Sequence, residues 1–195
     1  MINIKLLTND DYLTSVWSGG KTTQFYIYPE DAIYKELNFK FRISSATVEL
    51  DKSEFTKLDG VHRFITPLDK ELKLTHNHKD FVELKPFDVY EFEGGIDTTS
   101  FGTARDFNLM LANGAKGKLE NIFVGENYKL SRSLNNNQFM FLFNYDSKVE
   151  IVINDTRYAL NPMDSLFISV DEETNLDISI NSDKKCNMLM ARIDV

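Results

Sequence analysis

Two arginines in the first half of the chain are placed where they could bind a carboxylate. Arg42 lies in FKFRISSA, residues 39–46, and strand alternation puts it on the same face as Ser44. Arg63 begins a second strand-like segment. A guanidinium group binds a carboxylate through two parallel hydrogen bonds, so an arginine lining a barrel could hold a small acid. The alternative is that each arginine pairs with a structural aspartate or lies at a barrel rim.

A polar pair follows near the end of the same half. In RDFNLML, residues 105–111, Asp106 and Asn108 share one strand face, and the other face is apolar. The pair could contact a ligand in a pocket, or it could serve as a partner for Arg42. Both interpretations require strands that bring these polar groups together.

One segment resembles a metal-binding motif in residue type and spacing, because it contains His76, His78 and Glu83. A real site needs ligands on inward-facing strands and a further ligand from a later strand. The chain has no histidine after His78, and an internal repeat aligns this segment with a turn at residues 154–155. We therefore expect both histidines at an exposed hairpin tip, and we predict no metal and no cofactor.

The internal repeat relates residues 63–92 to residues 140–168. The alignment has an offset of 77 before the hairpin and 76 after it, and it matches the two Leu-x-Pro-x-Asp elements at 84–88 and 160–164. Repetition of this kind indicates two copies of one supersecondary unit. Arg63 aligns with Met140, so the two copies differ in charge at this position.

The repeated segments have the pattern of β-strands. Apolar and polar residues alternate, for example through residues 176–181, and turn residues separate the short runs. No long helix is predicted. We expect an all-β protein with two tandem antiparallel barrels, one over residues 1–112 and one over 113–195, closely packed as one unit. The glycine-rich stretch 113–117 is the expected linker.

Composition excludes several classes of function. The net charge is −8, which argues against binding to nucleic acid or to an anionic membrane. The N-terminus shows no secretory signal, and no apolar run approaches the length of a membrane-spanning helix. A single cysteine cannot form an internal disulfide. A cytoplasmic location is expected.

Five short segments occur in an order that is typical of one protein family: Trp17-x-Gly19-Gly20-x-Thr22-Thr23, Phe41-Arg42-Ile43-Ser44-x-Ala46, Phe55-x-x-Leu58-x-Gly60-x-x-Arg63, Leu84-x-Pro86 with Phe92-x-Gly94, and Asp106-Phe107-Asn108-Leu109-Met110. With these segments the chain resembles the HutD/Ves family. The resemblance implies a two-cupin fold of the jelly-roll type (a bicupin) without a metal centre, and an association with histidine-utilisation genes in a regulatory or auxiliary role. The sequence departs from the family at Phe41, where a tryptophan is common, and in the loops near Lys70 and His76.

The resulting hypothesis is a non-catalytic protein that binds a small carboxylate metabolite in its N-terminal barrel. The two arginines would bind the carboxylate, Trp17 and Phe92 would form an apolar wall, and the other residues would supply hydrogen bonds. The predicted ligand-binding residues are Trp17, Thr22, Thr23, Arg42, Ser44, Arg63, Phe92, Asp106 and Asn108.

Two other functions fit the same sequence. One is a metal-independent enzyme, an isomerase or hydrolase that acts on a small carboxylate with His62 or Asp106 as its base. It is the weaker reading, because no set of nucleophile, base and orienting group is visible. The other is a pure protein-interaction module, and a homodimer is compatible with any of the three.

Overall fold

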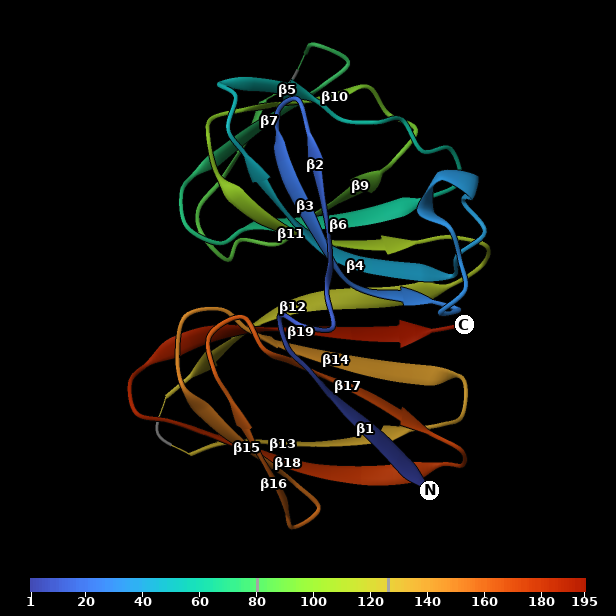
Figure 1. The fold of residues 1–195 in the computed structure, drawn as a ribbon, viewed down its shortest axis with the longest axis vertical. Coiled ribbons are helices and arrows are strands. Elements are labelled where there is room, and N and C mark those ends of the chain that lie inside the picture. Colours follow the sequence, from blue (N-terminus) through green and yellow to red (C-terminus); the bar gives the residue numbers. More distant parts are fainter. Residues whose placement is uncertain (80, 126) are drawn as a thin grey trace. The chain divides into compact units, whose positions relative to one another are not determined.

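The computed structural model describes residues 1–79, 81–125 and 127–195. Within these residues the chain consists of antiparallel strands and one short 3₁₀ helix, η1 (Tyr34–Glu36) (Figure 1). The all-β expectation is therefore confirmed. No helix in the described part of the chain is long and apolar enough to cross a membrane.

Residues 12–116 form one compact unit that contains two sheets. The six-stranded sheet has the order β2 (Leu13–Trp17), β3 (Gly20–Tyr28), β4 (Phe41–Val48), β11 (Arg105–Leu111), β6 (His62–Pro67), β9 (Tyr90–Glu93). The four-stranded sheet has the order β5 (Lys52–Glu54), β10 (Thr98–Phe101), β7 (Leu72–His76), β8 (Phe81–Leu84).

The second unit combines residues 1–11 with residues 117–195. Its strand orders match those of the first unit when each label from β4 to β11 is raised by eight. The five-stranded sheet has the order β1 (Ile2–Leu7), β17 (Ser165–Val170), β14 (Gln138–Asn144), β19 (Cys186–Asp194), β12 (Lys116–Val124). The four-stranded sheet has the order β13 (Tyr128–Leu134), β18 (Thr174–Ser182), β15 (Val149–Ile153), β16 (Thr156–Leu160).

The boundary between the units differs from the expected division at 112/113 in one important respect. The first eleven residues lie with the later half of the chain, because β1 pairs with β17 in the register Ile2↔Val170 to Leu7↔Ser165. A local sequence pattern carries no signal for a pairing across more than 150 residues. The other boundary, after residue 116, falls within the expected linker at 113–117.

The two hairpin turns that the repeat aligns have the same backbone conformation. Asn77 and His78 have φ values of 51° and 56°, and Asn154 and Asp155 have values of 43° and 69°. Two consecutive positive φ values are typical of the tight turn that joins twisted antiparallel strands. This places His78 at an exposed tip, as predicted.

His76 does not lie at that tip, so the expectation for this residue is wrong. It is the last residue of β7 and is only partly exposed. Its two ring nitrogens lie 2.9 Å from Thr98 Oγ1 and 3.0 Å from Tyr90 Oη. Burial lowers the pKa of its imidazole. His76 therefore links β10 of its own four-stranded sheet to β9 of the six-stranded sheet.

The two Leu-x-Pro-x-Asp elements also form matching turns. The residue after each proline has a positive φ, 68° at Phe87 and 74° at Met163, which is the third position of a type II turn. The aspartate then closes each turn. Asp88 Oδ2 accepts a 2.9 Å hydrogen bond from the Lys85 amide. Asp164 Oδ2 accepts a 2.8 Å hydrogen bond from the Asn161 amide. Each aspartate side chain therefore caps the turn that precedes its strand.

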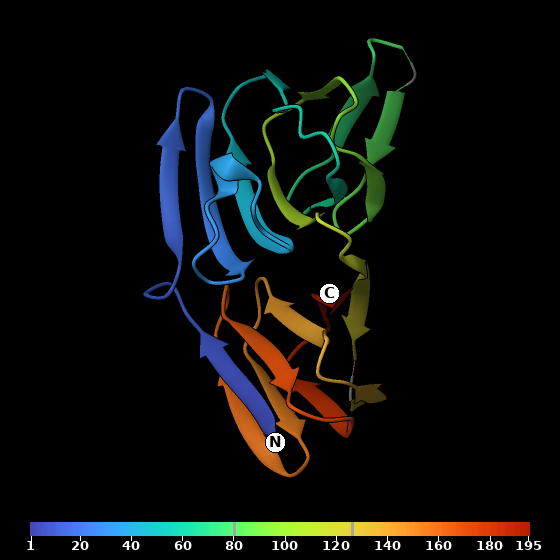
Figure 2. The ribbon, with the colours of Figure 1, turned by 90° about the vertical axis from the view of Figure 1, so that its right-hand side faces the viewer.

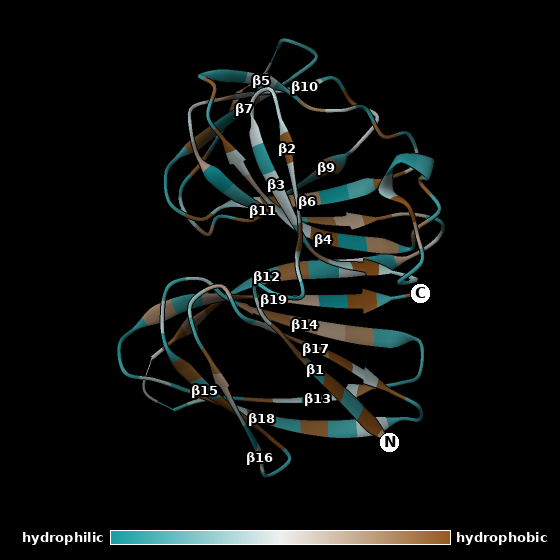
Figure 3. Ribbon diagram, in the orientation of Figure 1, coloured by the Kyte–Doolittle hydropathy of each residue, from teal (hydrophilic) through white to brown (hydrophobic). Residues whose placement is uncertain are grey.

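The interiors of the two units differ in polarity. Alternation along β18 buries Leu176, Ile178 and Ile180, and its brown and teal bands are visible in Figure 3. They belong to the apolar cluster of the unit of residues 1–11 and 117–195, in which Met140 is fully buried. In the unit of residues 12–116, the corresponding inner faces carry buried arginine, aspartate and asparagine side chains.

Candidate functional site

A cavity of about 310 Å³ lies in the unit of residues 12–116. Strands β2, β3, β4, β6 and β11 contribute to its wall, together with η1 and the segment around β5. The cavity brings together seven of the nine residues predicted to bind a ligand, namely Trp17, Thr22, Arg42, Ser44, Arg63, Asp106 and Asn108.

Arg63 is a buried cation of this cavity, with 6% of its surface exposed, the same fraction as Arg42. Its Nη2 donates a 2.9 Å hydrogen bond to Asn108 Oδ1. Its Nε is buried and has no hydrogen-bond partner among the described residues. The guanidinium carbon lies 4.8 Å from the ring centre of Phe55 and 5.1 Å from that of Phe92. Burial is the main cause that lowers the pKa of Arg63.

Arg42 is held in the same cavity by neutral groups. Its Nε donates a 2.7 Å bond to Gln24 Oε1, its Nη1 lies 3.3 Å from Ser44 Oγ, and its guanidinium carbon lies 4.2 Å from the ring centre of Tyr34. Burial lowers the pKa of Arg42 as well. In the described part of the chain, neither Arg42 nor Arg63 has a carboxylate within 4.0 Å, which is unusual for buried cations.

Asp106 lies on β11 and is 3% exposed. Its Oδ1 accepts a 3.1 Å bond from the Ala46 amide and a 2.6 Å bond from Asn108 Nδ2. Burial raises its pKa to about 6, and the hydrogen bond from Ala46 and the charge of Arg63 oppose that rise. Asn108 therefore links Arg63 to Asp106, since its amide oxygen accepts a hydrogen bond from Arg63 and its amide nitrogen donates one to Asp106.

The charge of the cavity is positive near neutral pH. Two arginines face one aspartate whose pKa of about 6 leaves it partly protonated there. Lys35 and Glu54 also line the cavity, one of each sign, so they offset each other. An electropositive cavity favours an anionic ligand.

Aromatic side chains form another part of the wall. Trp17 lines the cavity and remains 38% exposed. Its ring lies directly over Gly19, where an added Cβ would come within 2.1 Å of Trp17 Cζ3, so the glycine makes room for the ring. Tyr34 and Phe55 also line the cavity, and strand alternation could not identify them because both lie outside the strands.

Thr23, Phe92 and His62 do not line the cavity. Thr23 follows Thr22 on the same strand and faces the other way, where its Oγ1 lies 3.1 Å from Thr14 Oγ1. Phe92 is buried next to Arg63 and supports its guanidinium group from outside the cavity lining. The prediction that Thr23 lines the cavity is therefore wrong. Phe92 does not line the cavity itself, and it contributes to the site through its contact with Arg63.

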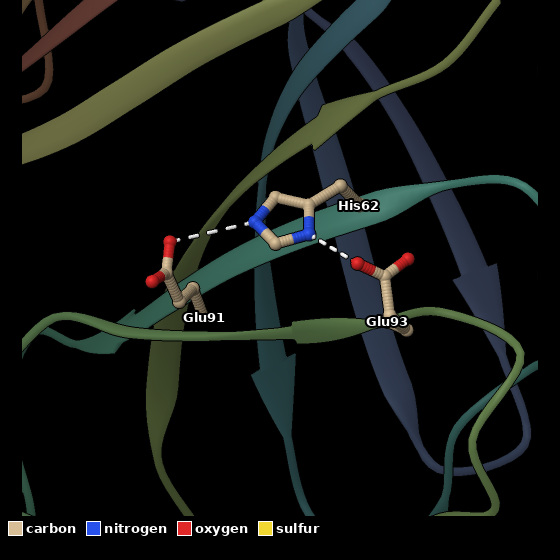
Figure 4. A network of polar contacts seen from close by, with 3 residues as sticks. All are labelled: His62, Glu91 and Glu93. Carbon is tan, nitrogen blue, oxygen red and sulfur yellow. Dashed lines mark hydrogen bonds and ion pairs between the residues drawn. The ribbon is translucent and has the colours of Figure 1, made fainter.

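His62 precedes Arg63 on β6, so strand alternation directs it to the opposite face of the sheet from Arg63. Its ring lies between Glu91 and Glu93 (Figure 4). Its Nδ1 lies 2.8 Å from Glu93 Oε1 and its Nε2 lies 3.4 Å from Glu91 Oε2, both on the neighbouring strand β9. A base in this position could not reach a molecule in the cavity. Among the described residues, no group of three or more His, Cys, Asp or Glu side chains could hold a metal ion.

Comparison with known proteins places the chain in a family. A family model described as HutD matches residues 9–189. The conserved protein of unknown function PA5104 from Pseudomonas aeruginosa PAO1 has a TM-score of 0.84 and 20% identity, over 99% of this chain and 100% of that one. HutD from Pseudomonas fluorescens SBW25 has a TM-score of 0.76 and 22% identity, over 98% of both chains.

More distant structures share the fold. The bacterial pirin YhhW from Escherichia coli, solved in complex with nickel(II), has a TM-score of 0.68 and 9% identity, over 97% of this chain and 98% of that one. No curated protein matches the chain. The structural neighbours indicate a cupin-like fold, and because the family model covers most of the chain, the protein belongs to the HutD family.

Proposed function

We propose that the protein binds a small carboxylate metabolite in the cavity of residues 12–116, without catalysis, in a regulatory or auxiliary role in histidine utilisation. The observation that carries this proposal is the state of Arg63, whose buried Nε has no partner. Taking a cation out of water costs several kcal/mol unless charge and hydrogen bonds compensate for it. A carboxylate that accepts from Nε and one Nη of this guanidinium would supply both.

The size and lining of the cavity favour a small ligand. A volume of about 310 Å³ lies near the lower end of the range of about 300–1,000 Å³ for small-molecule sites. Arg42 and Ser44 could bind a second polar group of the ligand, and Trp17, Tyr34 and Phe55 could contact its carbon skeleton. A metabolite with one or two carboxylates and a short chain or ring fits this description.

We also propose that the two units are copies of one cupin-like barrel and that only the first retains a ligand site. The matching strand orders and the two pairs of matching turns support a duplicated unit. Met140, the counterpart of Arg63, is fully buried in an apolar cluster of the second unit. The second unit then has a supporting role.

One observation favours catalysis as a second candidate function. Asp106 lines the cavity and its pKa is raised to about 6, which suits a general base or acid near neutral pH. The reaction would be a metal-independent isomerisation or hydrolysis of the same carboxylate ligand. Turnover of a bound ligand that is lost in Asp106→Asn would establish it, and a ligand recovered unchanged after prolonged incubation would exclude it.

A thermal-shift screen tests the binding proposal. We expect saturating urocanate, formiminoglutamate, formylglutamate or glutamate to raise the unfolding temperature, because a ligand at one hundred times its Kd adds about 2.7 kcal/mol of stability. For a chain of this length that corresponds to a shift of about 5–10 °C. The shift should disappear in Arg42→Ala and Arg63→Ala and persist in Arg157→Ala, an exposed arginine on β16. A folded protein that responds to none of these acids would refute the proposal.

A further inference from the structure

Strand β2 is an unprotected edge of the six-stranded sheet. It is the terminal strand in that sheet, and among the described residues it pairs only with β3 (Figures 1 and 2). All five of its residues are exposed, with Leu13 at 70% and Val16 at 83%. The backbone groups along the outer side of such a strand are available to pair with another strand.

The other sheet edges in the described part of the chain are protected by charge. The four sheets have eight edge strands, and seven of them contain at least one lysine, arginine or glutamate. Charged side chains on an edge strand oppose pairing with another chain. Strand β2, with the sequence LTSVW, contains neither a charged residue nor a proline. The seven charged edges are β1, β5, β8, β9, β12, β13 and β16.

We propose that a second copy of this chain docks on β2 by antiparallel pairing of the two β2 strands about a two-fold axis at Ser15. In this register Leu13 lies beside Trp17 of the partner subunit, and Thr14 lies beside Val16 of the partner subunit. The pattern is self-complementary, as a symmetric interface requires. The pairing joins the two six-stranded sheets into one continuous sheet, and cross-strand pairs of this type stabilise a sheet.

Charge at the two ends of β2 favours this antiparallel arrangement of two copies. Asp10 and Asp11 precede the strand, and Lys21 follows it as the exposed β3 neighbour of Val16. Antiparallel pairing brings the acidic end of each copy towards the lysine of the other, whereas parallel pairing places the acidic ends together. Because each chain carries a net charge of −8, two copies repel each other over most of their surface, and an uncharged edge is where they can approach.

The inferred interface adjoins the cavity. Ser15 and Trp17 are exposed residues of β2 and also line the cavity. A partner strand along β2 therefore covers one wall of the site, and each copy carries one cavity next to the interface. The inference does not depend on the identity of the ligand.

Sedimentation velocity between about 1 and 200 µM tests the interface. We expect the wild-type protein to be a dimer within this range and Val16→Lys to raise its dissociation constant at least about tenfold, because the substitution introduces the protection seen on the other edges. The control is Phe123→Lys, which replaces a 59% exposed side chain on another edge strand and should leave the dimer intact. A monomeric wild-type protein, or a Val16→Lys dimer of unchanged affinity, would overturn the proposal.

Cysteine cross-linking tests the register separately. Ser15 lies on the proposed two-fold axis, so two copies of Ser15→Cys should form a disulfide under mild oxidation, since directly opposed Cα atoms lie about 4.5–5.5 Å apart. Thr14→Cys should not, because Thr14 lies opposite Val16 of the partner subunit. The wild-type protein, in which Cys186 is buried, gives the background level of cross-linking. Equal cross-linking of the two variants, or none in either, would contradict the register.

Discussion

Arg63→Met is expected to abolish carboxylate binding and to leave the protein folded. The variant reproduces the residue at the corresponding position of the second unit, where Met140 is fully buried. The ligand would lose two charge-assisted hydrogen bonds, each worth about 1.5–3 kcal/mol, so the affinity should fall by about 100-fold or more. Titration calorimetry of a ligand found in the thermal-shift screen measures this change.

The effect of Arg63→Met on stability should be small because opposing contributions nearly cancel. Replacing a buried cation by an apolar side chain of similar length removes its desolvation cost. The substitution also leaves Asn108 Oδ1 without its donor, which costs about 1–3 kcal/mol. We expect the free energy of unfolding to change by less than about 2 kcal/mol in urea titrations. Retained ligand affinity in folded Arg63→Met would exclude Arg63 from the site.

A second large effect is expected from the pH dependence of Asp106. Burial raises its pKa from 3.8 to about 6, so between pH 4 and pH 6 the folded protein binds a proton that the unfolded chain has released. The free energy of unfolding contributed by this group is therefore highest below pH 4 and falls as pH rises through 6. The total loss is about 3 kcal/mol at most, from a shift of about two units.

Ligand binding should follow the same protonation step. Below pH 6 a neutral Asp106 leaves the charges of Arg42 and Arg63 uncompensated, so a carboxylate should bind more tightly at pH 5.5 than at pH 7.5. Asp106→Asn should remove the pH dependence of affinity and raise the free energy of unfolding at pH 7.5 by about 2 kcal/mol, because its amide oxygen can still accept from Ala46 and Asn108. The exposed Asp183→Asn should behave as the wild type. Affinity that rises with pH would contradict this assignment.

Strand parity explains why much of the cavity could be predicted from the sequence. The side-chain period of a strand is fixed at two, so Arg42 and Ser44 necessarily share a face, and so do Asp106 and Asn108. Register then places Met110 opposite both Arg42 and Arg63, which brings β4, β11 and β6 together around the cavity. The same rule shows why Thr22 and Thr23 could not both line it.

Other features of the site depend on contacts that no local pattern encodes. Tyr34 and Phe55 reach the cavity from segments outside the strands, where side-chain direction depends on the path of the loop rather than on a period. The pairing of β1 with β17 joins segments that lie more than 150 residues apart in the sequence. The burial of His76 results from Tyr90 and Thr98, which lie on two other strands. These are long-range contacts, and they became visible only in the folded chain.

The most direct measurement uses the chain's single tryptophan, Trp17, whose side chain lines the cavity. Its fluorescence can be titrated at pH 6 with a small carboxylate and, in parallel, with the amide of the same acid. We expect a saturable change in emission with the carboxylate, no change with the amide, and no change with either compound in Arg63→Met. An equal response to acid and amide, or no response to any carboxylate that fits the cavity, would contradict a carboxylate site built on Arg42 and Arg63.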